Sequence, residues 1–311
     1  MCGCASIRTT PSCWTRDLET VRPDRPVNLY RRLAMLPLAW LLLFALLPYA
    51  VLTKVSVAHI DEHLQPPFTA LIGEHGIIAN ADNYRFLASD PLYLNAYLGS
   101  LKIAGIATLL CLLIGYPLAY GIARANERWR LPLLMAIVLP FWTSFLIRVY
   151  AWIALLKTNG TVNQFLQWLG VINEPLQLLN TDAAVVCGIA YAYLPFMVLP
   201  LYAVLARLDV TLLEAAADLG ATSLRRFFSI TLPLSLPGVI AGALLVFIPA
   251  VGEFVIPDLL GGPDTLMIGK VLWNEFFING DWPVASTVAV VMMIVLVAPL
   301  LLFDRYASRA T

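Results

Sequence analysis

The sequence predicts an all-α protein that crosses a membrane six times. Composition is the first observation behind this prediction, because 60% of the 311 residues are hydrophobic and only 13% are charged. An ordinary soluble chain carries roughly 25% charged residues. The second observation is that the apolar residues gather in long runs, and an α-helix needs about 20 apolar residues to cross a bilayer. The third is the distribution of Lys and Arg, which alternates between the loops.

Six runs are long enough to form membrane helices. They cover residues 33–53, 96–123, 131–156, 184–206, 234–258 and 284–303. Prolines interrupt several of them, which membrane helices tolerate where neighbouring helices or a water-lined cavity satisfy the freed carbonyls. We therefore expect one membrane domain over residues 31–305, with a disordered tail over 1–30 and a short tail over 306–311.

The basic residues predict the orientation of the chain. One set of loops and both tails hold fourteen Arg residues, whereas the opposite loops hold four basic residues. Cytoplasmic loops carry the excess of Lys and Arg. Both termini and the loop over residues 207–233 are therefore expected in the cytoplasm. The opposite loops hold eleven acidic residues against four basic ones. This excess of negative charge either attracts cations or simply reflects the scarcity of Lys and Arg on that side.

The sequence favours neither a metal site nor a catalytic site. Cys2 and Cys4 could bind a metal, but no His or second Cys pair follows nearby, and a loose tail with reduced thiols is the alternative. His59 and His63 have the i, i+4 spacing of helical metal ligands, with a solvated loop as the alternative. No H-E-x-x-H, G-x-S-x-G or G-x4-G-K-[ST] pattern occurs, so we expect no catalytic residue and no ATP site in this chain.

The loop over residues 207–233 predicts two short helices joined by a sharp turn. Thr211 and Glu214 have the spacing of a capping box, which puts Glu214 in the first turn of a helix. Gly220 stands where a left-handed C-terminal cap is expected. Thr222 or Ser223 can cap a second helix over residues 224–230, which should end before Pro233. A capped loop helix without any partner is the alternative to a functional surface.

This loop resembles the cytoplasmic loop by which permeases of ABC importers grip their ATPase. The pattern is E-A-A-x3-G-x9-I-x-L-P, and the residues that form it or lie within it are Glu214, Ala215, Ala216, Asp218, Gly220, Ile230, Leu232 and Pro233. The resemblance implies that these residues couple the chain to a partner ATPase. Such a partner would bind the ATP and Mg, with no cofactor in this chain.

Longer segments resemble permeases of polyamine importers, the putrescine type especially. These segments are residues 141–152, 193–200, 247–263 and 281–286. The resemblance implies the type I ABC importer permease fold in a bacterial inner membrane. It also implies three protein partners, namely a second homologous permease that completes a heterodimer, an ATPase dimer and a periplasmic polyamine-binding protein. Membrane lipid is expected to surround the chain, and no nucleic acid is expected to bind it. A permease for another small solute and an ATP-independent secondary transporter are the alternatives.

Two charges lie inside the expected membrane helices and mark a candidate substrate path. Arg148 and Glu253 lie at similar distances from the cytoplasmic ends of the third and fifth runs, so both are expected at a similar depth in the membrane. Ionisable groups at such a depth face a partner or a water-filled path. In one interpretation Glu253 is a counter-charge for a diamine, with Asp258 nearby and cation–π faces from Trp142 and Tyr150. In another, Glu253 forms a salt bridge with Arg148. In a third, Glu253 reaches the outer interface.

Overall fold

The structure is a computed structural model that describes residues 27–60, 72–73, 76–77 and 81–310. The chain divides into two compact units, Met1–Val51 and Leu52–Thr311. Helix α1 (Val27–Ser56) forms the described part of the first unit and continues into the second. Residues 27–30, which the prediction placed in the tail, are helical, and the rest of the predicted tail, residues 1–26, lies outside the described part.

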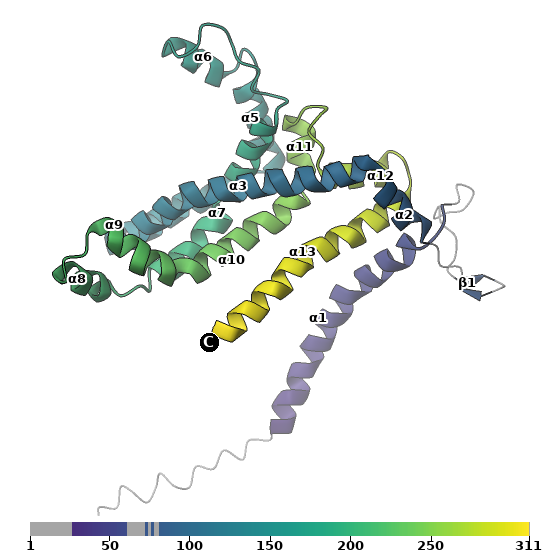
Figure 1. The fold of residues 1–311 in the computed structure, drawn as a ribbon, viewed down its shortest axis with the longest axis horizontal. Coiled ribbons are helices and arrows are strands. Elements are labelled where there is room, and N and C mark those ends of the chain that lie inside the picture. The colour runs from purple at the N-terminus through teal and green to yellow at the C-terminus, as the bar shows by residue number, and fades with distance from the viewer. Residues whose placement is uncertain (1–26, 61–71, 74–75, 78–80, 311) are drawn as a thin grey trace, which may run out of the picture. The chain divides into compact units, whose positions relative to one another are not determined.

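In its described residues, the second unit holds helices and one pair of two-residue strands (Figure 1). Strands β1 (Ile72–Gly73) and β2 (Gly76–Ile77) pair antiparallel, with Ile72 opposite Ile77. The helices in chain order are α2 (Asp82–Ser89), α3 (Pro91–Arg124), α4 (Glu127–Val138), η2 (Leu139–Trp142), α5 (Phe145–Leu156), α6 (Thr161–Trp168), α7 (Asp182–Leu205), α8 (Val210–Asp218), α9 (Ser223–Arg226), η3 (Phe227–Thr231), α10 (Leu232–Val251), α11 (Val255–Leu260), α12 (Ile268–Phe277) and α13 (Trp282–Ala310).

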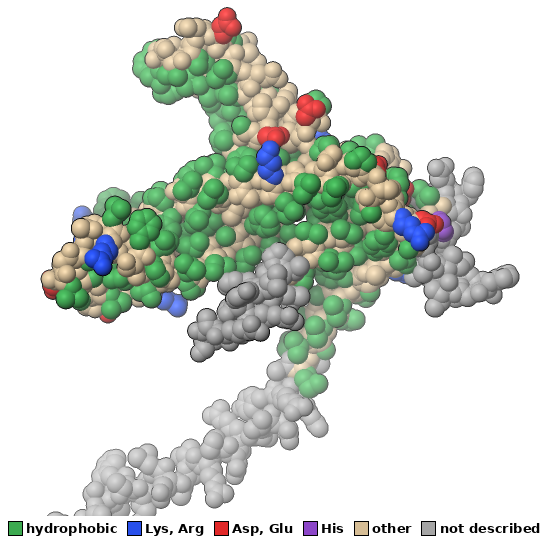
Figure 2. All heavy atoms as spheres, viewed as in Figure 1, with side chains coloured by type: hydrophobic (Ala, Val, Ile, Leu, Met, Phe, Trp, Pro, Cys, Tyr) green, Lys and Arg blue, Asp and Glu red, His purple; other side chains and the backbone are tan. Residues whose placement is uncertain are grey.

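Helices α3, α7 and α10 pack on one another and form the centre of the second unit (Figure 1). Their buried positions are dominated by small and aliphatic residues, such as Ala104, Ile189, Met197 and Val246. Small residues let membrane helices approach closely, and packing then supplies most of their association energy. On the face shown in Figure 2, hydrophobic side chains cover the length of these helices.

The expected third crossing is not one straight helix. The chain from Glu127 to Trp142 and the chain from Phe145 to Trp168 meet at a bend of 91°. Pro140 lies in the short 3-10 helix η2 at this bend, and Thr143 and Ser144 follow it in extended conformation. Pro140 has no N–H to continue the helical ladder, which removes one bond near the break in the predicted run 131–156, although α7 continues through Pro195 and Pro200.

The expected fifth crossing ends earlier than predicted. Helix α10 ends at Val251, Gly252 follows it, and α11 begins at Val255. Pro257 has no N–H to donate to the carbonyl of Glu253, so a helix cannot continue through this position with its regular bonds. The predicted run 234–258 is therefore wrong at its outer end, and Glu253 lies in a break between two helices.

Four helices of the described chain are long and apolar enough to cross a membrane, or five if the bent pair is one span. They are α1, α3, α7 and the helix from Ser223 to Val251. Helix α13 adds an apolar stretch over Trp282–Val297. It continues to Ala310, so most of the expected tail over 306–311 is helical. All-α architecture is confirmed, and six crossings remain a prediction consistent with these helices.

Candidate functional site

The loop between α7 and α10 begins with a capped helix. The side-chain carboxylate of Asp209 accepts a hydrogen bond of 2.9 Å from the N–H of Thr211, which lowers the pKa of this exposed carboxyl. Asp209 is thus the N-cap of α8, and the predicted capping box of Thr211 and Glu214 is wrong. Glu214 lies beyond the first turn, because the cap stands two residues before Thr211. Aspartate is among the strongest N-cap residues, which explains its preference over threonine.

Helix α8 ends at the predicted glycine. Gly220 has φ of +80°, and its N–H donates to the carbonyl of Ala217 at 2.8 Å. The N–H of Ala221 donates to the carbonyl of Ala216 at 3.0 Å. Together the two bonds form a Schellman motif, in which the left-handed residue is usually glycine. The predicted positive φ of Gly220 is confirmed.

The second half of the loop is not a separate short helix. Thr222 caps α9 by accepting from the N–H of Arg225 at 3.4 Å, as predicted. The helix then passes through one π-turn, η3, and continues into α10 without a stop. The expected end before Pro233 is wrong. The N–H of Leu232 donates to the carbonyl of Phe227, five residues back, and this wider turn shifts the ladder just before the proline.

The predicted coupling residues lie on an exposed surface with an unusual apolar content. Glu214, Ala215, Asp218, Gly220 and Pro233 are exposed, while Ala216, Ile230 and Leu232 are half-buried. Leu219 and Leu224 flank the turn and are 89% and 72% exposed. Phe228 is exposed beside them. Apolar side chains gathered on an exposed loop indicate contact with another macromolecule. We call Glu214, Asp218, Leu219, Gly220, Leu224 and Phe228 the loop surface.

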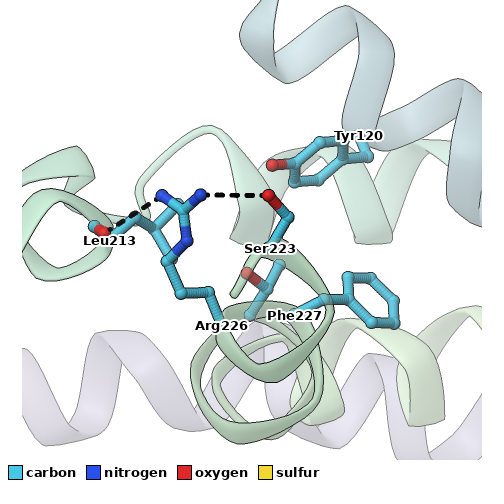
Figure 3. A pocket seen from close by; sticks show the side chains of 6 residues that line it. Tyr120, Leu213, Ser223, Arg226 and Phe227 are labelled. Atoms are coloured by element: carbon cyan, nitrogen blue, oxygen red, sulfur yellow. Dashed lines mark hydrogen bonds between the residues drawn. The ribbon is translucent and has the colours of Figure 1, made fainter. Parts of the chain in front are cut away.

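Behind the loop surface lies a small cavity of about 150 Å³. Side chains from α3, α8 and the α9–α10 helix line it (Figure 3). They are Tyr120, Leu213, Ser223, Arg226, Phe227 and Thr231. The guanidinium of Arg226 spans the cavity wall, donating to the carbonyl of Leu213 at 3.3 Å and to the hydroxyl of Ser223 at 3.1 Å (Figure 3). Sequence reasoning assigned Arg226 no contact within the loop.

The second group of candidate residues centres on the break between α10 and α11. Glu253 is only 9% exposed. Its Oε2 accepts a hydrogen bond of 2.6 Å from the hydroxyl of Tyr193 on α7. Its Oε1 accepts from the N–H groups of Val255 at 3.1 Å and Ile256 at 3.4 Å. The carboxylate thus caps α11 and ties the break to α7.

Arg148 does not meet Glu253. Among the described residues the two form no ion pair, so the salt bridge, one of the three interpretations of Glu253, is absent from this structure. The guanidinium of Arg148 lies over the ring of Phe141 at 4.7 Å and near that of Phe145 at 5.8 Å. Within the described part of the chain, its buried Nε and Nη1 have no hydrogen-bond partner. Arg148 is therefore held by aromatic faces.

The other candidate path residues are exposed to solvent. Trp142 in η2 is 80% exposed, and Tyr150 on α5 is 57% exposed. Asp258 on α11 lies 3.3 Å from the Nζ of Lys270 on α12. Helix α11 packs against α5, so Asp258 and Tyr150 come from neighbouring elements.

An apolar cavity of about 650 Å³ opens beside Tyr193. Its other lining residues belong to α7 and α10, and they are Phe196, Ala241, Leu244, Leu245, Ile248 and Pro249. The ring of Phe196 contacts those of Tyr193 and Phe141. An aromatic chain from Phe141 through Phe196 to Tyr193 therefore links the vicinity of Arg148 with Glu253. Sequence reasoning missed Tyr193, because residues 193 and 253 meet only through packing.

Comparison with protein families matches residues 112–311 to the model described as "Binding-protein-dependent transport system inner membrane component". Among curated proteins, the chain is 42% identical over 271 residues to the "Spermidine/putrescine transport system permease protein PotB" of Haemophilus influenzae, covering 87% of this chain and 91% of that protein. It is 43% identical over 270 residues to the protein of the same name from Escherichia coli K12, covering 87% of this chain and 94% of that protein.

Among solved structures, a similar fold occurs in the "Crystal structure of a bacterial ABC transporter involved in the import of the acidic polysaccharide alginate". The TM-score is 0.67 at 17% identity, and the match covers 91% of this chain and 96% of that chain. At this identity the likeness concerns the fold alone.

Proposed function

Because this chain belongs to the family of binding-protein-dependent transport system inner membrane components, we propose that it is a membrane-spanning subunit of an ATP-driven importer for polyamines. The observation that carries the proposal is the identity of 42% and 43%, over 87% of the chain, to proteins named spermidine/putrescine permeases. The cargo is putrescine or spermidine, with putrescine favoured by the sequence segments described above. The chain itself performs no catalysis.

The loop surface is the contact with the ATPase in this proposal. Exposed leucines and Phe228 around a rigid glycine turn support this role, since an isolated loop would expose polar side chains instead. The ATPase dimer binds ATP and Mg, and both termini lie with the loop in the cytoplasm. A second homologous permease completes the path, and a periplasmic protein delivers the polyamine.

The path residues take different roles in this proposal. The exposed rings of Trp142 and Tyr150 are available to a cation, because aromatic faces attract ammonium groups. The carboxylate of Asp258 is partly exposed but paired with Lys270, so an ammonium group would compete with Lys270 for it. Glu253 shapes the path, since its carboxylate already accepts three hydrogen bonds. Apolar walls such as those of the cavity beside Tyr193 suit the methylene spacer between two ammonium groups.

Uptake in a strain deleted for this chain tests the cargo. The full set of subunits should restore accumulation of labelled putrescine and spermidine, and unlabelled polyamine should compete where a neutral sugar does not. If the neutral sugar reduces uptake of the label as much as unlabelled polyamine does, the polyamine assignment is contradicted.

Reporter fusions test the orientation of the chain. A reporter after Arg309 is expected in the cytoplasm, and one within the segment around residue 74 is expected in the periplasm.

Gly220→Val tests the contact with the ATPase. A β-branched residue at positive φ costs about 1–2 kcal/mol and should distort the turn, so that less ATPase co-purifies with the permease. Gly170→Val is the matched control, because Gly170 also has positive φ, at +69°, with open space around it, and lies in another loop. Equal ATPase recovery in both variants would contradict the role of the loop surface.

A further inference from the structure

Arg226 holds the two halves of the loop together. It stands at the end of α9, and its guanidinium reaches across to the carbonyl of Leu213 on α8 at 3.3 Å. The same guanidinium donates to the hydroxyl of Ser223 at 3.1 Å (Figure 3). A charged donor to a carbonyl is stronger than a neutral one. This planar group therefore clamps α8, which carries Glu214 and Asp218, to the start of the α9–α10 helix.

The next residue connects this clamp to the centre of the protein. The ring of Phe227 meets the ring of Tyr116 on α3 edge to face, with centroids 5.5 Å apart. The hydroxyl of Tyr116 lies 2.8 Å from the hydroxyl of Ser235 on α10. Ser235 donates its single proton to the carbonyl of Leu232, so Tyr116 is the donor to Ser235. Tyr116, Thr231 and Ser235 are all buried.

The helix that carries these contacts runs without a break from the loop into the helical bundle. It continues from Ser223 to Val251, and the π-turn over Phe227–Thr231 is its one irregular stretch. A displacement of α8 can therefore pass through Arg226 to α9 and through Phe227 to both α3 and α10. Besides the bond from Arg226, the turn over residues 219–222 joins α8 to α9.

We propose that Arg226 is the positioning residue that transmits movement of the loop surface to α3 and α10, with Phe227, Tyr116 and Ser235 as the receiving contacts. This inference rests on the proposed function, because the movement comes from a partner ATPase. It concerns residues behind the loop surface, which need not touch that partner. Loss of the clamp leaves the ATPase bound but uncouples its cycle from the membrane helices.

The test is transport per ATP hydrolysed by the complete importer in proteoliposomes. Arg226→Met should keep ATPase binding and basal hydrolysis, while putrescine transported per ATP falls about fivefold or more, the size of a typical coupling between sites. Arg226→Lys, which keeps the charge and loses the planar fork of donors, should recover part of the ratio. Arg128→Met is the matched control, because Arg128 is an exposed arginine on α4, outside the loop, and should leave the ratio unchanged.

A ratio in Arg226→Met equal to that of Arg128→Met would overturn the proposal, even if the variant accumulates poorly. If Arg226→Met does not assemble, Ser223→Ala removes one of the two bonds, and its ratio should fall about twofold, as expected for loss of one modest hydrogen bond. An unchanged ratio in Ser223→Ala would then overturn it. Failure of the wild-type chain to co-purify with an ATPase would refute the proposed function instead, so the two failures are distinguishable.

Discussion

The chain from Ser223 to Leu260 contains two irregular stretches, and they are built differently. At Phe227–Thr231 the helix widens into a π-turn and continues, with Phe227 packed on Tyr116 of α3. At Gly252–Phe254 the helix stops, and the carboxylate of Glu253 caps the next helix. Both stretches lie near a proline, Pro233 in the first case and Pro257 in the second.

The difference shows that a proline alone does not decide whether a membrane helix continues. Before Pro233 the bond from Leu232 to Phe227 shifts the ladder, and no glycine interrupts it. Before Pro257 a glycine ends α10, and a carboxylate offers the freed N–H groups another acceptor. The first stretch keeps the helix continuous, whereas the second allows α11 to take a separate direction and pack against α5.

The largest effect is expected from removing the cap at the break. Glu253→Ala leaves the N–H groups of Val255 and Ile256 and the hydroxyl of Tyr193 without their acceptor. Each unsatisfied buried group costs about 1–3 kcal/mol, so a loss of about 3 kcal/mol or more is expected. The melting temperature of the purified protein in detergent measures it. Glu253→Gln keeps an acceptor oxygen and should lose about 1 kcal/mol. Equal melting temperatures for Glu253→Ala and Glu253→Gln would mean that the charge of Glu253, and not its capping of α11, stabilises the protein.

A side chain at Gly269 should disturb the same break from its other side. A Cβ on Gly269 would collide with the carbonyl oxygen of Gly252 and lie 2.6 Å from that of Glu253. Backbone atoms cannot move aside as a side chain can, so Gly269→Ala should cost about 1–3 kcal/mol. Gly105→Ala is the control, because nothing lies within 4 Å of its Cβ position on α3. Equal melting temperatures for the two variants would contradict the close approach.

At the π-turn the expected effects are smaller. Tyr116→Phe removes the hydrogen bond to Ser235 and keeps the ring against Phe227, at a cost of about 1 kcal/mol. Ser235→Ala should cost a similar amount. Because the two residues share one bond, the double variant should lose less than the sum of the single losses. Thermal unfolding of the wild type, the two single variants and the double variant gives the four stabilities of this double-mutant cycle. If the two single losses add exactly in the double variant, the hydrogen bond between Tyr116 and Ser235 is excluded.

The smallest effect concerns the exposed cap of α8. Asp209→Ala should speed amide hydrogen exchange in the first turn of α8, while Asp209→Asn, which keeps an acceptor, should not. The folded pKa of Asp209 is lowered, so its contribution is complete above the ordinary carboxyl pKa and is lost as the pH falls through the lowered value. Amide exchange in the first turn of α8 should therefore be as fast in the wild type as in Asp209→Ala only in strong acid. If the difference in exchange between the two proteins grows on acidification, the expected direction of the pH dependence is wrong.

Local patterns predicted part of the loop correctly and part of it wrongly. The turn at Gly220 was predictable, because a left-handed residue after an alanine helix needs glycine and depends on its neighbours alone. The start of α8 was predicted wrongly, because the spacing of Thr211 and Glu214 matches a capping box, whereas Asp209 is the stronger N-cap residue and forms the cap. The end before Pro233 was wrong, since the packing of Phe227 and Thr231 against the bundle stabilises a π-turn that the sequence does not reveal.

The sequence by itself determined the fold class and the family, because apolar runs of bilayer length and a spaced loop pattern depend only on residues close along the chain. Only the tertiary structure decided which polar groups meet. Tyr193 and Glu253 are 60 residues apart, and Tyr116 and Ser235 are 119 apart. Glu253 bonds to Tyr193 and not to Arg148 because the breaks at η2 and Gly252 redirect the helices that carry them. A straight helix through either run would have aligned different side chains at that depth.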